Sequence, residues 1–297
     1  MTTYRIEEIE GGIRIFGLKN FHLSHIFENG QAFRWDKTCE GSYIVVAGDK
    51  IAEFMMERDC LLAYNCSRED FEDFWHSYFN LDVDYDHIKE ELRKTRAYHE
   101  NDSLKEAMDF AYGLRILKQD RFEMIISFII SANNRIGQIK KSIRLLSENY
   151  GTYIGDYKGT SYYAFPRSDQ LAYQDPEEIK EICRVGFRNT RIVEAARRYL
   201  EEPELFENGD LDRLKANLID LPGVGPKVMD CILLFGYGVE DTFPIDVWVK
   251  RLMETLYIKD RISNREILIK ARDLFGNYLG HAQQYLFYYA REHAIGK

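Results

Sequence analysis

The sequence predicts an α+β protein in which an antiparallel β-sheet domain comes first and a large, all-helical region follows. Short apolar runs separated by turn residues fill the chain up to about residue 66, as in a sheet. From about residue 69 onward, apolar residues recur every three or four positions, as in helices. We place the boundary at residue 95, which gives a sheet domain with a flanking helix (1–95) and a helical region (96–297).

The strands are clearest between residues 43 and 56. The apolar runs Tyr43–Ala47 and Ile51–Met56 are separated by the turn residues Gly48 and Asp49, and a polar turn, Glu57–Asp59, follows the second run. Consecutive strands with such short connections pair antiparallel, because a parallel pair needs a long crossover.

Helical periodicity begins with Phe71, Phe74, Trp75 and Phe79, which share one face of a helix. Glycines separate several of the helical segments that follow. These expected helices are Leu104–Leu117, Phe122–Tyr150, Pro176–Cys183, Arg188–Leu200, Leu211–Ile219, Lys227–Phe235, Val247–Tyr257, Asn264–Leu279 and Ala282–His293.

Composition argues against several classes of protein. Of 297 residues, 45% are hydrophobic, enough for a sizeable core, but no apolar run is long enough to span a bilayer. The acidic N-terminus lacks the pattern of a signal peptide, so we expect a cytoplasmic protein, nucleoid-associated if bacterial, with no membrane partner. The five cysteines form no CxxC pair, which argues against a disulfide framework and a zinc site, and we expect no metal site.

Charge is distributed unevenly along the chain. The net charge of −9 taken alone disfavours nucleic acid as a partner. Acidic residues are dense in the first hundred positions, whereas basic residues cluster later, so a local basic face could bind DNA. Solvated helix faces are the alternative. The basic residues in question are Arg135, Lys140, Lys141, Arg144, Arg184, Arg188, Arg191, Arg197 and Arg198.

The strongest local pattern is Leu221–Lys227, which has the sequence LPGVGPK. Gly223 and Gly225 allow a sharp turn and a close approach of the backbone to a ligand, and Pro226 favours the start of a new helix. Amides in such a turn bind anions, and a DNA phosphate suits the site. The pattern predicts a helix-hairpin-helix over residues 211–235, with an ordinary corner between two helices as the alternative.

Lys227 is expected in the first turn of the second helix, whose positive end disfavours the ammonium form. A neutral amine is a nucleophile. Cys231 follows one turn later on the same face. Taken alone, Lys227 fits a solvated surface lysine better.

Asp246 lies nineteen residues after Lys227 and precedes an apolar helical run. An aspartate in this place is a good helix N-cap, and capping alone would explain it. A lysine after a glycine hairpin, followed by such an aspartate, is a more specific combination than either residue alone.

The segment from Leu221 to Arg251 resembles the signature of the HhH-GPD superfamily of base-excision DNA glycosylases, named for its helix-hairpin-helix, Gly/Pro-rich loop and aspartate. In that superfamily the aspartate supports chemistry at the sugar C1′. A lysine at the hairpin marks the bifunctional members, which also cut the DNA strand. The resemblance therefore implies catalytic roles for Lys227 and Asp246.

Four further segments resemble one branch, the 8-oxoguanine DNA glycosylase/AP lyases of the Ogg family. The other branches fit less well. No cysteine follows Cys231, where endonuclease III and the adenine glycosylases usually carry an iron–sulfur cluster, and the alkyladenine branch lacks the hairpin lysine. The four segments are Asn29–Trp35 (NGQAFRW), Tyr78–Asp84 (YFNLDVD), Ser127–Asn134 (SFIISANN) and Ala282–Phe287 (AQQYLF).

This resemblance implies a set of base-binding residues. Gly30 would accept, through its carbonyl, the N7 proton that 8-oxoguanine has and guanine lacks. Gln283 would bind the Watson–Crick edge, and Phe287 and Cys231 would sandwich the base. Without the ordered segments, a turn glycine, a surface amide, a core phenylalanine and a buried thiol explain these residues equally well.

The same resemblance implies DNA-binding residues. Asn133 would fill the gap left by the flipped nucleotide, and Phe187 and Arg188 would wedge near the orphaned cytosine. Gly223 and Gly225 would hold the DNA backbone. A helix cap, a core phenylalanine and a solvated charge are the alternatives for the first three.

Four positions depart from the family pattern. Gln138 stands where many members have an arginine that faces the orphaned cytosine, and Phe187 replaces a tyrosine. Trp248 replaces a histidine two residues after the aspartate, and Arg135 replaces an asparagine. These departures affect recognition of the opposite base and the fine geometry of the pocket, not the class of reaction.

By resemblance, the protein is expected to act as a monomer on double-stranded DNA that contains 8-oxoguanine. It would flip the oxidised base, release it through a lysine Schiff base and cut the strand by β-elimination. No cofactor is required, although hairpin carbonyls could hold a monovalent cation. The alternatives are a glycosylase for oxidised pyrimidines or alkylated purines, and a non-catalytic DNA-binding module with the same hairpin.

Overall fold

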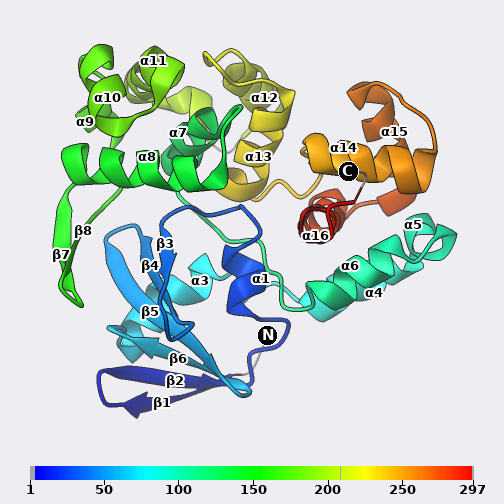
Figure 1. Ribbon diagram of the computed structural model, residues 1–297, viewed down its shortest axis with the longest axis horizontal. Coiled ribbons are helices and arrows are strands. Elements are labelled where there is room, and N and C mark those ends of the chain that lie inside the picture. Colours follow the sequence, from blue (N-terminus) through cyan, green and yellow to red (C-terminus); the bar gives the residue numbers. More distant parts are fainter. Residues whose placement is uncertain (1–3, 208, 296–297) are drawn as a thin grey trace.

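The structure is a computed structural model that describes residues 4–207 and 209–295. It has three parts: a β-sheet unit at the lower left, one helical lobe above it and a second helical lobe at the right (Figure 1). Each part has its own apolar core. The predicted order, an antiparallel sheet followed by a largely helical region, is confirmed.

The sheet contains six strands, all paired antiparallel, in the order β1-β2-β6-β5-β4-β3. One face carries Tyr43, Val45 and Phe54, and packs on a helical stretch over residues 68–78 in which Phe71 and Trp75 are buried. The strands are β1 (Arg5–Ile9), β2 (Gly12–Phe16), β3 (Trp35–Lys37), β4 (Tyr43–Ala47), β5 (Lys50–Glu57) and β6 (Cys60–Tyr64), and a short helix, α1 (Leu23–Phe27), lies between β2 and β3.

The first helical lobe surrounds helix α7, whose residues 122–130 are all buried. The prediction of one helix over Phe122–Tyr150 is wrong, because the chain turns at Ala132 and Asn133 takes a left-handed φ of 51°. The lobe consists of α7 (Arg121–Ser131), α8 (Ile136–Tyr150), α9 (Ser168–Leu171), α10 (Pro176–Cys183), η2 (Gly186–Arg188), α11 (Asn189–Glu201), η3 (Pro203–Phe206), α12 (Leu211–Ile219) and α13 (Pro226–Tyr237).

The second helical lobe joins two distant segments of the chain in one core. Helix α4 belongs to this core, although the predicted boundary at residue 95 assigns it to the first domain; that boundary stays a prediction. The elements are α4 (Tyr85–Lys94), α5 (Arg96–Glu100), α6 (Ser103–Phe110), α14 (Val247–Leu252), η4 (Met253–Ile258), α15 (Asn264–Phe275) and α16 (Leu279–Glu292).

The helix predicted over Leu104–Leu117 ends at Phe110, because the following residues pack along the sheet unit. His22 donates its backbone N–H to the Gly113 carbonyl at 3.0 Å. A Cβ atom on Gly113 would lie only 2.5 Å from the His22 backbone nitrogen, so the contact requires glycine. Tertiary packing therefore ends a helix that the local pattern would continue.

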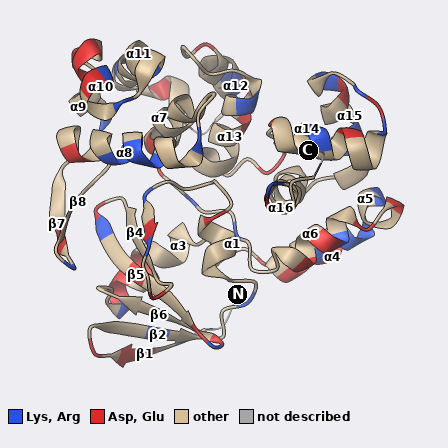
Figure 2. Cartoon of the chain, viewed as in Figure 1, with Lys and Arg blue, Asp and Glu red and all other residues tan. Residues whose placement is uncertain are grey.

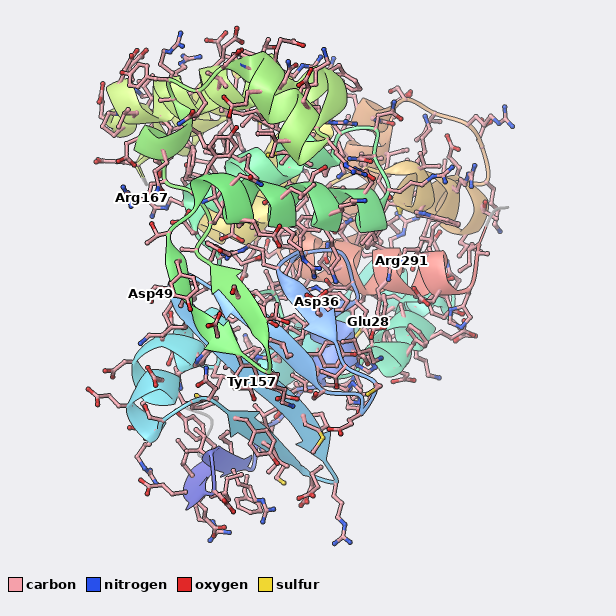
Figure 3. The ribbon with its side chains drawn as sticks, turned by 60° about the vertical axis from the view of Figure 1, so that its left-hand side comes forward. Glu28, Asp36, Asp49, Tyr157, Arg167 and Arg291 are labelled. Atoms are coloured by element: carbon pink, nitrogen blue, oxygen red, sulfur yellow. The ribbon has the colours of Figure 1, made fainter. Side chains whose placement is uncertain are left out.

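The helical region also contains two strands, β7 (Tyr153–Tyr157) and β8 (Thr160–Tyr163), which the prediction of an all-helical region missed. This hairpin lies over the second face of the main sheet, where Tyr157 points toward the strands (Figure 3). Its apolar side chains, with those of the sheet, form a small core of Ile44, Val46, Ile51, Ile154, Tyr157 and Tyr162.

A buried carboxylate holds this hairpin to the sheet. Glu53 of β5 is 2% exposed and accepts hydrogen bonds from Ser42 Oγ (2.6 Å), Tyr157 OH (2.6 Å) and Lys158 Nζ (2.8 Å). Burial by itself raises the pKa of Glu53, but the hydrogen bonds from Lys158, Ser42 and Tyr157 outweigh it and leave the pKa below its usual value. The ionised carboxylate therefore links the helical region to the sheet.

None of the helices that the structure describes is long and apolar enough to cross a membrane.

We expect Glu53→Ala to lower the free energy of unfolding by about 2 to 3 kcal/mol, because three donors lose their shared acceptor. Glu57→Ala, at the exposed end of the same strand, removes an ion pair to Arg14 and should cost less than about 1 kcal/mol. Urea denaturation at neutral pH measures both. Equal stability of the two variants would contradict a role for Glu53 in docking the hairpin.

Candidate active site

A cavity of about 60 Å³ lies where the sheet unit meets the two helical lobes. It contains six of the predicted site residues, which come from the turn after α1, from α13, from the start of α14 and from α16. The residues that line it are Asn29, Gly30, Phe128, Lys227, Cys231, Phe235, Pro244, Asp246, Gln283, Gln284 and Phe287.

Lys227 reaches the cavity from the first turn of α13, which begins at Pro226 as predicted. Its Nζ lies 5.5 Å from the centre of the Phe128 ring, which stacks on Phe235. Cys231 lies one turn further along α13, where burial raises the pKa of its thiol and the nearby Lys227 only partly offsets the effect. The amine therefore faces a neutral and largely apolar wall.

Asp246 is both a helix cap and a lining residue of the cavity. Its Oδ1 accepts a hydrogen bond from the Val249 backbone N–H at 2.8 Å, which caps α14. Burial raises the pKa of Asp246, while the bond from Val249 and the charge of Lys227 pull it down. Capping fixes the carboxylate at the cavity, so the structural and functional interpretations of this residue are compatible.

Gly30 forms the wall that the sheet unit contributes. Its φ of +87° favours glycine, and a Cβ atom there would lie 3.6 Å from both Phe287 Cε1 and Arg291 Nη1. Arg291 of α16 also donates to the Glu28 carbonyl, so α16 is joined to this turn (Figure 3).

The fully buried Gln31 anchors the same turn. Its Nε2 donates to the carbonyls of Ile26 (2.8 Å) and Arg115 (2.7 Å), and its Oε1 accepts from the Leu117 N–H (2.9 Å). Its own carbonyl accepts from Gln119 Nε2 at 2.9 Å. Gly30 is therefore attached to the segment that leads directly into α7.

The amide of Gln283 is held at both ends. Its Nε2 donates to the Pro244 carbonyl (3.0 Å), and its Oε1 accepts from Gln284 Nε2 (2.6 Å). The Oε1 of Gln284 is buried without a hydrogen-bond partner among the described residues. Gln284 was not predicted as a site residue. The only feature of the sequence that pointed to it was its position next to Gln283.

Phe128, Asn29 and Pro244 also line the cavity, and the sequence singles out none of them. Asn29 shapes the turn by donating to the His25 carbonyl and accepting from the Gln31 N–H. Its position before Gly30 was the only sequence signal for that role.

At about 60 Å³, the cavity leaves little free space between the Phe287 ring and the Gly30 turn. Because the Phe287 ring is the close neighbour of Gly30, a base that enters between them must displace that ring.

The predicted DNA-binding residues lie on loops. Asn133 and Phe187 are exposed, on the α7–α8 turn and on η2. Gly223, with a φ of +88°, and Gly225 lie in the turn between α12 and α13, so the predicted hairpin is present.

Arg188 does not lie where a residue that wedges into DNA would be expected. Its side chain is buried, and it donates to the carbonyls of Val185 (3.1 Å), Ala132 and Asn133 (3.0 Å). It therefore supports the turn that presents Asn133, instead of facing solvent. Gln138 lies close to Ser142 and to the Arg184 carbonyl, and Arg135 is exposed beside it.

In residues 4–207 and 209–295, no group of three or more His, Cys, Asp or Glu side chains is placed to hold a metal ion.

Sequence comparison identifies two family domains in the chain. Residues 15–125 match the 8-oxoguanine DNA glycosylase N-terminal domain, and residues 126–276 match the HhH-GPD superfamily of base excision DNA repair proteins. A curated relative, the N-glycosylase/DNA lyase of Saccharomyces cerevisiae, is 27% identical over 79% of this chain and 68% of its own length.

Solved structures resemble the whole chain. A complex of MBOgg1 with a low-affinity DNA ligand is 42% identical, with a TM-score of 0.90 over 98% of this chain and 99% of the other. The Clostridium acetobutylicum 8-oxoguanine glycosylase/lyase, bound to double-stranded DNA with cytosine opposite 8-oxoguanine, is 39% identical, with a TM-score of 0.91 over 99% and 100% of the two chains. The chain therefore belongs to the 8-oxoguanine DNA glycosylase family within the HhH-GPD superfamily of base excision DNA repair proteins.

Proposed function

We propose that this protein is a bifunctional glycosylase and AP lyase that excises 8-oxoguanine from duplex DNA. The observation that carries the proposal is one cavity in which an amine, a carboxylate and a positive-φ glycine turn converge from separate parts of the chain: Lys227, Asp246 and Gly30. The names of its relatives, N-glycosylase/DNA lyase and 8-oxoguanine glycosylase/lyase, support the same activity.

The reaction begins when the damaged nucleotide leaves the base stack, at a cost of a few kcal/mol. The Lys227 amine then attacks the sugar C1′, and a C–N bond forms as the bond to the base breaks. The base departs with the bonding electron pair and takes up a proton. The sugar ring opens to a Schiff base on Lys227, loss of a C2′ proton expels the 3′ phosphate, and water releases the amine.

Asp246 stabilises this sequence electrostatically. Positive charge develops on the sugar as the base departs, and a carboxylate held by a helix cap needs no reorganisation to face it. The neutral side chains beside Lys227, including Phe128 and Cys231, lower the polarity around the amine and so strengthen the interaction.

The oxidised base would replace the present contact between Phe287 and Gly30. The base would stack between Phe287 and Cys231, with Gln283 at its Watson–Crick edge and Gly30 at its N7 proton. Because Gln283 is already hydrogen-bonded to Pro244 and Gln284, its amide is oriented before the base arrives.

Double-stranded DNA would lie against the loops that carry Asn133 and Phe187 and against the hairpin amides of Gly223 and Gly225. Lys and Arg residues gather on α8, the helix that follows the Asn133 turn (Figure 2). We propose that the protein acts as a monomer. We also propose that it needs no cofactor, because an amine and a carboxylate suffice for each step. A monovalent cation at the hairpin carbonyls stays a prediction.

Borohydride trapping on a duplex with 8-oxoguanine opposite cytosine tests the proposal. We expect the parent protein to form a covalent adduct and Lys227→Gln to form none, because the Schiff base needs that amine. Lys250→Gln, a partly exposed lysine of α14, serves as the matched control and should trap fully.

Adducts on duplexes with oxidised pyrimidines or alkylated purines, but not with 8-oxoguanine, would mean another lesion is the substrate. No adduct with any lesion would mean a DNA-binding module without catalysis.

We expect single-turnover excision to decline as pH falls through the pKa of Asp246, since only the carboxylate form stabilises the sugar cation. Burial raises this pKa, so the decline should begin above the usual range of an aspartate. Asp246→Asn should be slower by on the order of 10² to 10³ and should lack this acid limb.

Asparagine caps helices about as well as aspartate, so thermal unfolding of Asp246→Asn should match the parent. An unfolded variant, or one that keeps the parent rate, would show that Asp246 is only a cap.

We expect a preference of less than about a hundredfold for cytosine over other bases opposite the lesion. Gln138 is neutral, and the buried Arg188 already donates to backbone carbonyls, so neither is free for a charge-assisted contact. Single-turnover excision from duplexes that differ only in the opposite base measures the ratio. A much larger ratio that disappears in Arg135→Ala would mean that Arg135 reads the cytosine instead.

A further inference from the structure

One face of helix α11 lies along the hairpin turn. Arg191 and Arg198 are seven residues apart, two helical turns, and therefore point to the same side. Arg198 donates to Asp220 at 2.6 Å, at the end of α12. Arg191 lies against Gly223 of the turn, where a Cβ atom would come within 2.7 Å of its Cδ and 3.1 Å of its Nη1.

The two arginines differ in their partners. The pair with Asp220 engages Arg198 and offsets the charge of the carboxylate that directly precedes Leu221 in the chain. In the described part of the chain, Arg191 has neither a carboxylate nor a hydrogen-bond acceptor within bonding distance. Its guanidinium instead lies 5.0 Å from the centre of the exposed Phe187 ring.

The other arginines nearby are already engaged. Arg188 is buried and bonded to three backbone carbonyls, although its charge also lies 4.3 Å from the Phe187 ring. Arg197, six residues after Arg191, donates to the Ala172 carbonyl and lies over Tyr173, away from the turn. Arg191 is thus the cation of α11 that is both partly exposed and unpaired beside the hairpin.

The hairpin turn supplies donors for the same anion. The backbone N–H of Val224 is used within the turn, on the Leu221 carbonyl, whereas those of Gly223 and Gly225 have no acceptor among the described residues. The unpaired guanidinium therefore lies beside a turn that has two free amides, and Gly223 leaves room for the arginine side chain.

We propose that Arg191 binds a DNA backbone phosphate together with the hairpin amides, and that it holds Phe187 toward the duplex at the same time. A guanidinium makes charge-assisted bonds to phosphate that amides alone do not. In a chain with a net charge of −9, a local contact of this kind counts heavily for affinity. The inference rests on one part of the proposed function, namely that the protein binds DNA.

Binding of an undamaged duplex, followed by fluorescence anisotropy over a series of salt concentrations, tests this inference. We expect Arg191→Ala to weaken binding about five- to tenfold at low salt and to reduce the slope of log K against log salt by about 0.9, the value for one phosphate contact. Arg191→Lys should recover most of the slope, because the charge remains. Arg197→Ala is the matched control on the same helix and should keep the parent slope.

An unchanged slope in Arg191→Ala would overturn the proposal. So would a loss of affinity that depends on the base sequence of the duplex, since that pattern means base recognition. The undamaged duplex separates this test from the catalytic one: a protein that fails to excise 8-oxoguanine but shows the slope change still has the contact.

Discussion

The hydrogen bonds of Gln31 fix the geometry on which the candidate active site depends. This buried amide joins α1, the Gly30 turn and the extended segment 115–119, which enters α7 two residues later. An amide in the interior must have its donors and acceptors satisfied, and here its partners come from α1 and from the segment 115–119. Gly30 thereby meets the helical lobes at one defined place.

Packing between the helices then positions the reactive groups relative to the Gly30 turn. Helix α7 packs on α13, and Phe128 of α7 stacks on Phe235 beside Lys227. Interiors are densely packed, so a shift of the sheet unit cannot be absorbed locally. The β7–β8 hairpin adds a second attachment through Glu53, on the opposite face of the sheet.

Several residues combine a structural and a functional position. Asp246 caps α14 while its carboxylate lines the cavity, and Arg188 supports the turn whose tip is Asn133. A capping bond holds a catalytic carboxylate in place without additional residues. The Phe287 ring lies against the Gly30 turn at this cavity, so a base that enters between them has to move that ring.

Local patterns along the chain are sufficient to predict the order of sheet and helices, the hairpin around Gly223 and the spacing of Lys227 and Asp246. Each of these depends on neighbours within a few residues: apolar period, turn glycines, a proline at a helix start and a capping aspartate. The clustering of Gly30 with Gln283 and Phe287 was expected through family resemblance, not through any local rule.

Contacts between distant parts of the chain select which local tendencies prevail. The break at Ala132–Arg135 depends on Arg188, far along the chain, and the end of α6 depends on contact between Gly113 and His22. The β7–β8 hairpin is stable because it packs on the far face of the sheet. Arg188 is buried and Arg191 is unpaired because the fold brings carbonyls near the first guanidinium and, among the described residues, no carbonyl or carboxylate within bonding distance of the second. Long-range contacts of this kind produce no periodic pattern in a sequence, so local rules do not predict them.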